Sequence, residues 1–193
     1  MSADVLHRVG PNALIQTLSA VRALAGSAMQ DAVLNASGLK LPPGGWQDMV
    51  PADQVNRLNG AVLTVLGRDA ATKALRDAGH RTGQYILDNR IPRLAQGALG
   101  LLPSRLARSL LLKAIGKSAW TFAGSAEVSV GPDWILIWNN PVCLGQSGYD
   151  GCAWHTGVFQ VLFQTILKTD VDVRETHCIG RGDPYCRFKI TLR

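Results

Sequence analysis

The sequence predicts an α+β fold in which a helical layer packs on an antiparallel sheet of about four strands. Three observations carry this prediction. Apolar residues recur at helical spacing through the first two thirds of the 193-residue chain. From Trp120 the apolar period changes to two, which is typical of strands. Glycine- and proline-containing turns then mark two hairpins on either side of one long apolar segment.

The expected helices are separated by glycines and prolines that start or end helices. Pro42-Pro43-Gly44-Gly45 marks a loop, and Gly67 separates two long helices. Pro92 and Pro103 divide the Leu- and Ala-rich region that follows. The helices are expected at residues 11–24, 27–34, 51–66 and 69–89, and in two short segments after Pro92 and Pro103.

The strands follow from residue alternation and from turn residues. Trp120 to Gly124 is expected to enter the sheet, and residues 126–130 pair with 134–138, a strand that looks covered on both faces. An apolar helix is expected at about 153–168. The final hairpin turns at Gly180-Arg181-Gly182-Asp183-Pro184, and one face of its last strand carries Cys186, Phe188, Ile190 and Leu192.

Composition narrows the classes of function. The chain is 47% hydrophobic and 18% charged, with a net charge of +6. No apolar stretch approaches the roughly 18 residues of a membrane span, and no apolar signal segment opens the chain, so we expect a cytoplasmic protein. No helix-turn-helix, zinc-finger or aromatic–basic strand pattern predicts nucleic-acid binding.

Three cysteines and a glutamate near the C-terminus predict a metal site. Cys178 and Cys186 are equidistant from Gly182, so they should face each other across the last hairpin. Glu175 can reach the same ion only if its strand bends or ends near His177, because odd spacing points to opposite faces. With Cys152 upstream, we interpret the set as a tetrahedral structural zinc site with three sulfurs and one oxygen.

Other interpretations of these cysteines stay open. A disulfide between Cys178 and Cys186 fits the geometry but not a reducing cytoplasm. Buried thiols without a ligand are also compatible, because free cysteine packs as a small hydrophobe. Cys143 is either an alternative ligand or a core residue, and the core position is the favoured one.

A basic segment follows the fourth helix. Its six cations are Arg90, Arg93, Arg105, Arg108, Lys113 and Lys117. Between Ser104 and Lys117 the cations fill one side of a helical wheel, and leucines, alanines and isoleucine fill the other. Such a helix contacts an anionic membrane, binds carboxylated ligands, or is a solvated face.

These features together identify a resemblance. The ending Glu-x-x-Cys…Gly-x-Gly-Asp-x-x-Cys-x-Phe, the Trp120–Gly124 segment and the Arg90-Ile91-Pro92 break resemble the vinyl-4-reductase domain family, specifically its bacteriochlorophyll-synthesis branch. The likeness covers most of the chain and is strongest over residues 67–193, which it implies are a ligand-binding domain forming one compact unit with the N-terminal helical region 1–66. The family's ligand pattern maps onto Cys152, Glu175, Cys178 and Cys186. A homodimeric fold similar to vesicle-tethering complex subunits, with a cavity between helices and sheet, is also implied.

The family name implies reduction of a vinyl group on a chlorophyll precursor, which ordinarily requires a nicotinamide or flavin. Gly180-Arg181-Gly182 is the sole fragment of a dinucleotide fingerprint, and it opens a strand rather than a helix. We therefore favour a tetrapyrrole-binding carrier or accessory protein for a magnesium porphyrin or divinyl protochlorophyllide-type intermediate, working with enzymes of that synthesis. A reductase using an external electron donor and a small-molecule sensor are the alternatives.

The sequence also nominates residues for a tetrapyrrole site. A flat apolar ligand needs aromatic faces, and the candidates are Trp120, Phe122, Trp138, Phe159 and Phe163. His80 is the candidate magnesium ligand. Arg90 and Arg93 are the candidates for propionate groups, because arginine pairs bidentately with carboxylates. The remaining cations would face a membrane, in a peripheral contact, or an acidic partner enzyme.

Overall fold

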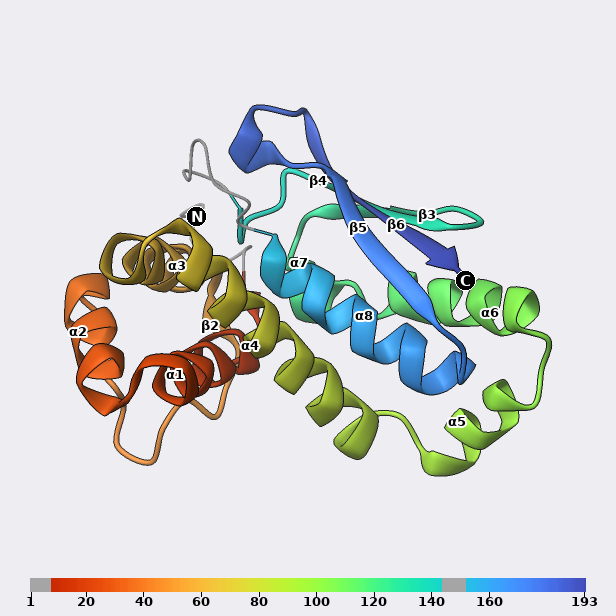
Figure 1. The fold of residues 1–193 in the computed structure, drawn as a ribbon, viewed down its shortest axis with the longest axis horizontal. Coiled ribbons are helices and arrows are strands. Elements are labelled where there is room, and N and C mark those ends of the chain that lie inside the picture. Colours follow the sequence, from red (N-terminus) through yellow and green to blue (C-terminus); the bar gives the residue numbers. More distant parts are fainter. Residues whose placement is uncertain (1–7, 144–151) are drawn as a thin grey trace, which may run out of the picture.

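The computed structural model of the protein describes residues 8–143 and 152–193, and it has the expected α+β architecture (Figure 1). Its helices are α1 (Asn12–Ala25), α2 (Ser27–Ser37), α3 (Ala52–Leu66), α4 (Arg68–Asn89), α5 (Arg93–Gly100), α6 (Ser104–Lys117), α7 (Trp120–Ala123) and α8 (Ala153–Leu167). Its strands are β1 (Arg8–Val9), β2 (Val50–Pro51), β3 (Glu127–Val130), β4 (Trp134–Trp138), β5 (Val171–His177) and β6 (Tyr185–Leu192). The predicted helices are present, with boundaries shifted by a few residues.

The main sheet has the strand order β3-β4-β6-β5, and every neighbouring pair is antiparallel. This confirms the predicted antiparallel sheet of about four strands. Ile137 lies opposite Cys186, and Val173 lies opposite Ile190, so the buried face is continuous across three strands. β1 and β2 form a separate two-stranded pair.

Two predictions about this region were wrong. Trp120–Gly124 does not enter a strand: residues 120–123 form α7, directly after α6, and the first strand begins only at Glu127. β4 is not covered on both faces, because Ile135 and Ile137 are buried while Trp138 is 36% exposed. In Figure 1 the neighbouring helices α6 and α8 lie on the same side of the sheet, which accounts for the alternation.

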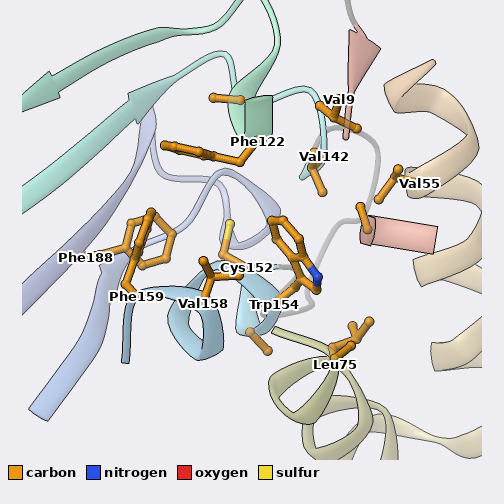
Figure 2. Packing of buried hydrophobic residues seen from close by; sticks show 14 of the residues in the cluster. Val9, Val55, Leu75, Phe122, Val142, Cys152, Trp154, Val158, Phe159 and Phe188 are labelled. Carbon is orange, nitrogen blue, oxygen red and sulfur yellow. The ribbon is translucent and has the colours of Figure 1, made fainter. Parts of the chain in front are cut away.

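The core runs from the sheet into the N-terminal helices. Figure 2 shows it continuing from Phe159 and Phe188 through Cys152 and Trp154 towards Val55. Phe159 contacts Phe188 edge to face, with ring centroids 5.2 Å apart. The helical region 12–66 and the sheet therefore share one apolar interior, and α8 forms its centre.

α4 and α8 cross at very close range. A Cβ atom on Gly79 of α4 would overlap the backbone of Trp154, and one on Gly157 of α8 would overlap the carbonyl of Arg76. Glycine is thus required where the two backbones meet. This crossing fixes α8 against α4, which also packs on α1 and α3. Within the two described ranges, no helix is long and apolar enough to cross a bilayer.

Candidate metal centre

The four cysteines of the chain gather at one end of the sheet. Their sulfur atoms all lie within 4.8 Å of one another, and all four residues are buried. The Sγ atoms of Cys152 and Cys186 are 3.2 Å apart, and those of Cys143 and Cys178 are 3.4 Å apart. Four sulfurs at about 2.3 Å from one tetrahedral ion would be about 3.8 Å apart. The cluster is therefore compatible with a metal site.

Each cysteine comes from a different junction of the fold. Cys143 lies in the turn after β4, and Cys152 immediately precedes α8. Cys178 follows β5 and precedes the short 3-10 helix η2 (Ile179–Arg181), while Cys186 is the second residue of β6. These junctions converge because β4, β5 and β6 are neighbours in the sheet and α8 begins beneath its end.

A bulge at the end of β5 places Cys178 in the cluster. Glu175 pairs with Phe188, but His177 pairs with Arg187, so Thr176 is an extra residue in the ladder. One extra residue reverses the alternation, and the side chains at 175 and 178 then point to the same face. The bend and the strand end at His177 that the sequence analysis required are both present.

Hydrogen bonds from the surrounding residues converge on the sulfurs. The Nδ2 atom of the fully buried Asn140 lies 3.4 Å from Sγ of Cys152 and 3.6 Å from Sγ of Cys186. Its Oδ1 accepts a hydrogen bond from the backbone of Val142, which fixes the amide orientation. The carboxylate of Asp183 accepts the N–H of Cys178 at 2.7 Å. Donors of this kind orient thiolate ligands around a metal.

The electrostatics of the cluster are those of four coupled thiols. Burial raises the pKa of Cys152 well above its usual value. Hydrogen bonds from the neighbouring thiols lower the pKa of Cys178 and of Cys186. Four thiolates cannot be adjacent in a dry site without a compensating cation, because each charge opposes the next. A divalent metal ion supplies that charge.

Glu175 lies beside the cluster but is not one of its four mutually close members. Its side chain is 8% exposed, and Oε1 has no hydrogen-bond partner in the described part of the chain. Burial, followed by the charge of Cys178, raises the pKa of this carboxyl to about 9. Nη1 of Arg181 is 3.7 Å from Oε2, too distant to offset the burial.

The observed cluster thus differs in one member from the predicted ligand set. Cys152, Cys178 and Cys186 are brought together as expected, and Cys143 takes the place in which Glu175 was expected. Sequence reasoning had favoured a core position for Cys143, and it did not single out Asn140. Asn139 has a positive φ of 48° at the end of β4 and turns the chain back towards the cluster.

The aromatic residues proposed for a tetrapyrrole pocket do not form one group. Phe122 and Phe159 make an edge-to-face contact at 5.7 Å, and Phe163 is fully buried in the same core. Trp120 is 61% exposed on α7, and Trp138 lies on the outer face of the sheet against Tyr185. The first three are core residues, whereas the two tryptophans are surface residues.

The polar candidates are also dispersed. His80 is half-buried in α4 next to the crossing with α8, and burial lowers its pKa. Arg90 and Arg93 are exposed at the junction of α4 and α5. All three residues lie in the segments where they were expected, on one long helix and the turn that follows it.

Two buried polar groups between the N-terminal helices and α8 were not found from the sequence. Nε1 of Trp154 and both amide atoms of Asn59 have no hydrogen-bond partner among the described residues. Trp154 is 5% exposed and Asn59 is 1% exposed. In Figure 2 the indole nitrogen of Trp154 is on the side facing Val55, one turn before Asn59 on α3. Neither residue type carries a pattern that would have indicated this position.

Comparisons with known proteins give two kinds of match. The family model of the vinyl-4-reductase domain matches residues 135–192. The Bacteriochlorophyll synthase 23 kDa chain of Cereibacter sphaeroides is 41% identical over 96% of this chain and 91% of its own length. The protein of the same name from Rhodobacter capsulatus is 36% identical over 94% of this chain and 85% of its own length.

Solved structures share the fold at low identity. An H-NOX mutant from K. algicida has a TM-score of 0.64 and 11% identity, covering 96% of this chain and 97% of its own. An H-NOX structure from work on heme distortion has a TM-score of 0.57 and 14% identity, covering 96% and 94%. A trafficking protein particle complex subunit 3 from Naegleria fowleri, covalently bound to palmitic acid, has a TM-score of 0.53 and 16% identity, covering 74% and 95%. The expected likeness to vesicle-tethering subunits holds for the fold.

Proposed function

Because this chain belongs to the family of the bacteriochlorophyll synthase 23 kDa chains, we propose that it serves bacteriochlorophyll synthesis as a tetrapyrrole-binding carrier or accessory protein with a structural zinc. The observation that carries this proposal is the match to both relatives over nearly the whole chain. Its ligand would be a magnesium porphyrin or a divinyl protochlorophyllide-type intermediate, and its partners would be the enzymes that make or use that intermediate.

The fold supports the ligand class. H-NOX structures with the same architecture include one from work on heme distortion in that family, so this arrangement of helices and sheet can hold a porphyrin macrocycle. Fold likeness alone does not establish a shared ligand, because one fold hosts many functions. The family membership and the fold lend independent support to a tetrapyrrole ligand.

The orphaned polar groups of Trp154 and Asn59 support a ligand position between α3 and α8. Leaving a buried donor or acceptor unpaired costs about 1–3 kcal/mol. Such groups in a native protein indicate an absent water, ion or ligand. A tetrapyrrole seated between the N-terminal helices and α8 would pair its carbonyl or carboxylate oxygens with the indole N–H of Trp154 and the amide of Asn59. Arg90 and Arg93 stay candidates for its propionates.

The cysteine cluster supports a structural zinc. Four sulfur ligands suit zinc or an iron–sulfur site, and a four-ligand zinc has no open position for a substrate. Zinc would tie together the turn after β4, the start of α8 and the hairpin of β5 and β6. We propose Cys143, Cys152, Cys178 and Cys186 as the ligands.

The proposal is tested by titrating purified zinc-loaded protein with magnesium protoporphyrin, with and without NADPH, while absorbance is recorded. A carrier or accessory protein binds the porphyrin and leaves its vinyl groups unchanged in both conditions. Vinyl reduction that appears when an electron donor is added would favour the alternative, a reductase using an external donor. Absence of binding to any tetrapyrrole would refute both hypotheses.

Paired substitutions locate the ligand. Trp154→Phe and Asn59→Leu remove the orphaned polar atoms but keep the apolar bulk, and each should weaken porphyrin binding by about tenfold, the value of a hydrogen bond worth about 1.4 kcal/mol. Trp138→Phe is the matched control on the outer face of the sheet. Equal affinities in all three variants would exclude the site between α3 and α8 without excluding porphyrin binding.

A further inference from the structure

Helix α5 displays its apolar side to solvent. Leu94 is 89% exposed and Leu101, at its C-terminal end, is 85% exposed. Seven residues separate them, so they lie on one face of the helix together with Gly97 and Ala98. None of the eight residues of α5, all of them described, is buried, and a Cβ at Gly97 would meet no atom within 4 Å.

The opposite side of α5 is what attaches the helix to the protein. Nε2 of Gln96 donates hydrogen bonds to the carbonyls of Leu87 and Ile91, at 2.6 and 2.8 Å. Gly100 approaches Ile166 and Lys168 at the end of α8. α5 is therefore held in an orientation that keeps Leu94 and Leu101 in water. The apolar stripe of an amphipathic helix ordinarily faces the core.

The exposed stripe is surrounded by positive charge alone. The sequence has no aspartate or glutamate between Asp88 and Glu127, a stretch with six lysines and arginines. Arg93 begins α5, and Arg105 lies in the first turn of α6. α6 continues the pattern on its exposed positions, which are Arg105, Leu106, Leu110, Lys113 and Lys117.

One of the six cations is not available to a partner. Arg108, in the predicted basic surface, is partly buried, and its Nη1 lies 3.5 Å from the carbonyl of Ile190. Beside it a groove of about 410 Å³ between α6 and the end of β6 is lined by Arg105, Arg108 and Lys189, with Asp133 as its acidic member. The groove extends the positive surface from α6 towards the sheet.

We propose that α5 and the exposed side of α6 form a surface that binds an anionic lipid membrane. Leu94 and Leu101 would enter the interface between headgroups and acyl chains, and Arg105, Lys113 and Lys117 would contact the anionic headgroups. Figure 1 shows α5 and α6 at the end of the molecule away from α1, α2 and α3, so the surface is free of the N-terminal helices.

Charge and shape favour a bilayer over a protein. A second copy of the chain would bring the same cations face to face, and like charges across an interface oppose association. Lysines are depleted and aromatic residues are enriched in protein interfaces, whereas this surface combines leucines with lysines and arginines. Leucines that project from a helix need no complementary pocket in a bilayer.

The test is cosedimentation of the whole zinc-loaded protein with vesicles of phosphatidylcholine, with and without phosphatidylglycerol. Binding should require phosphatidylglycerol and should weaken as salt is added, because the headgroup attraction is screened. Leu94→Ser together with Leu101→Ser should weaken binding at least tenfold. Arg105→Gln, Lys113→Gln and Lys117→Gln should each weaken it about fivefold.

Matched controls use the other end of the molecule. Leu24→Ser with Leu41→Ser removes two leucines that are 49% and 58% exposed, and Arg22→Gln with Lys40→Gln removes two exposed cations there. These variants should bind like the original protein, and circular dichroism verifies that every variant is folded. Equal losses in test and control variants, or no binding to anionic vesicles, would overturn the proposal. So would self-association that the leucine substitutions abolish in sedimentation experiments without lipid.

Discussion

Cys143 and Glu175 compete for the fourth position beside Cys152, Cys178 and Cys186. Cys143→Ser should reduce bound zinc well below one ion per chain, because a hydroxyl is a poor zinc ligand. Glu175→Gln should leave about one zinc per chain, since its carboxyl is not among the four mutually close groups. Elemental analysis of the purified variants measures both. The reverse order would restore the set in which Glu175 is a ligand.

His155 makes the fold sensitive to acid. It is fully buried against Phe122, Phe159 and Phe188, and burial lowers its pKa to about 4. The unfolded chain takes up a proton below about pH 6.5 that the folded protein refuses until about pH 4, so stability falls as pH falls through that window. At pH 5 this costs about 2 kcal/mol.

His155→Phe should remove that part of the pH dependence. Urea denaturation at pH 7 and at pH 5 should show a fall in unfolding free energy that is smaller for the variant by about 2 kcal/mol. Loss of metal in acid affects both proteins, so the difference between them isolates the histidine. Parallel losses in the two proteins would assign the acid sensitivity to other groups.

The sequence predicted Cys152, Cys178 and Cys186 because a hairpin turn and ligand spacing are local properties. It did not predict the part played by Cys143, since that depends on how the chain turns after β4. The turn uses a positive φ at Asn139, a conformation that asparagine tolerates but does not announce. The orphaned atoms of Asn59 and Trp154 could not be predicted, because they depend on which helices meet.

At the scale of elements, the α4–α8 crossing should be the least tolerant contact of the fold. Gly79→Ala would drive a methyl group into the backbone of α8, and the helices would have to separate, at a cost of about 2–4 kcal/mol. Gly60→Ala in α3 is the matched control, because a Cβ there meets nothing within 4 Å. Alanine should stabilise α3 by up to about 1 kcal/mol.

Thermal or urea denaturation of the two alanine variants measures this difference. A large loss for Gly79→Ala and a small gain for Gly60→Ala is the expected result. Similar effects at both positions would mean that α4 and α8 can move apart without loss, contrary to the close backbone approach seen here.

Long periodic elements were predictable and short transitional ones were not. α1, α3, α4 and α8 follow from apolar repeats that extend over several turns. The region around Trp120 was misassigned, because four residues after a helix carry too little periodicity to distinguish another helical turn from a strand. Only the backbone hydrogen bonds from Phe122 and Ala123 to Ala119 reveal the turn of α7.

At the scale of the whole molecule, removal of the metal should destabilise the sheet and α8 together. The four sulfurs join three junctions of the sheet to the start of α8, so a chelator removes a link between elements that are distant in sequence. The melting temperature should fall by roughly 10 °C or more, as expected for a loss of several kcal/mol. Returning zinc should restore it, and a melting temperature that chelation leaves unchanged would exclude a structural metal.

The layered architecture was predictable from the sequence, but the outward face of α5 was not. The stripe formed by Leu94 and Leu101 reads as a core-facing pattern, because amphipathic helices usually bury such residues. What reverses it is the attachment of Gln96 to Leu87 and Ile91, a contact between elements that periodicity does not encode.

The order of strands across the sheet bears on how the protein folds during synthesis. β6 lies between β4 and β5, yet it leaves the ribosome after both of them. Until it emerges, β4 has an open edge on the side of the missing strand, and the metal cluster lacks Cys186. The nascent chain therefore exposes an apolar strand edge, which is an aggregation hazard, through the synthesis of α8 and β5. A zinc-poor cell or a slow final stretch of translation should lengthen that interval and increase dependence on chaperones.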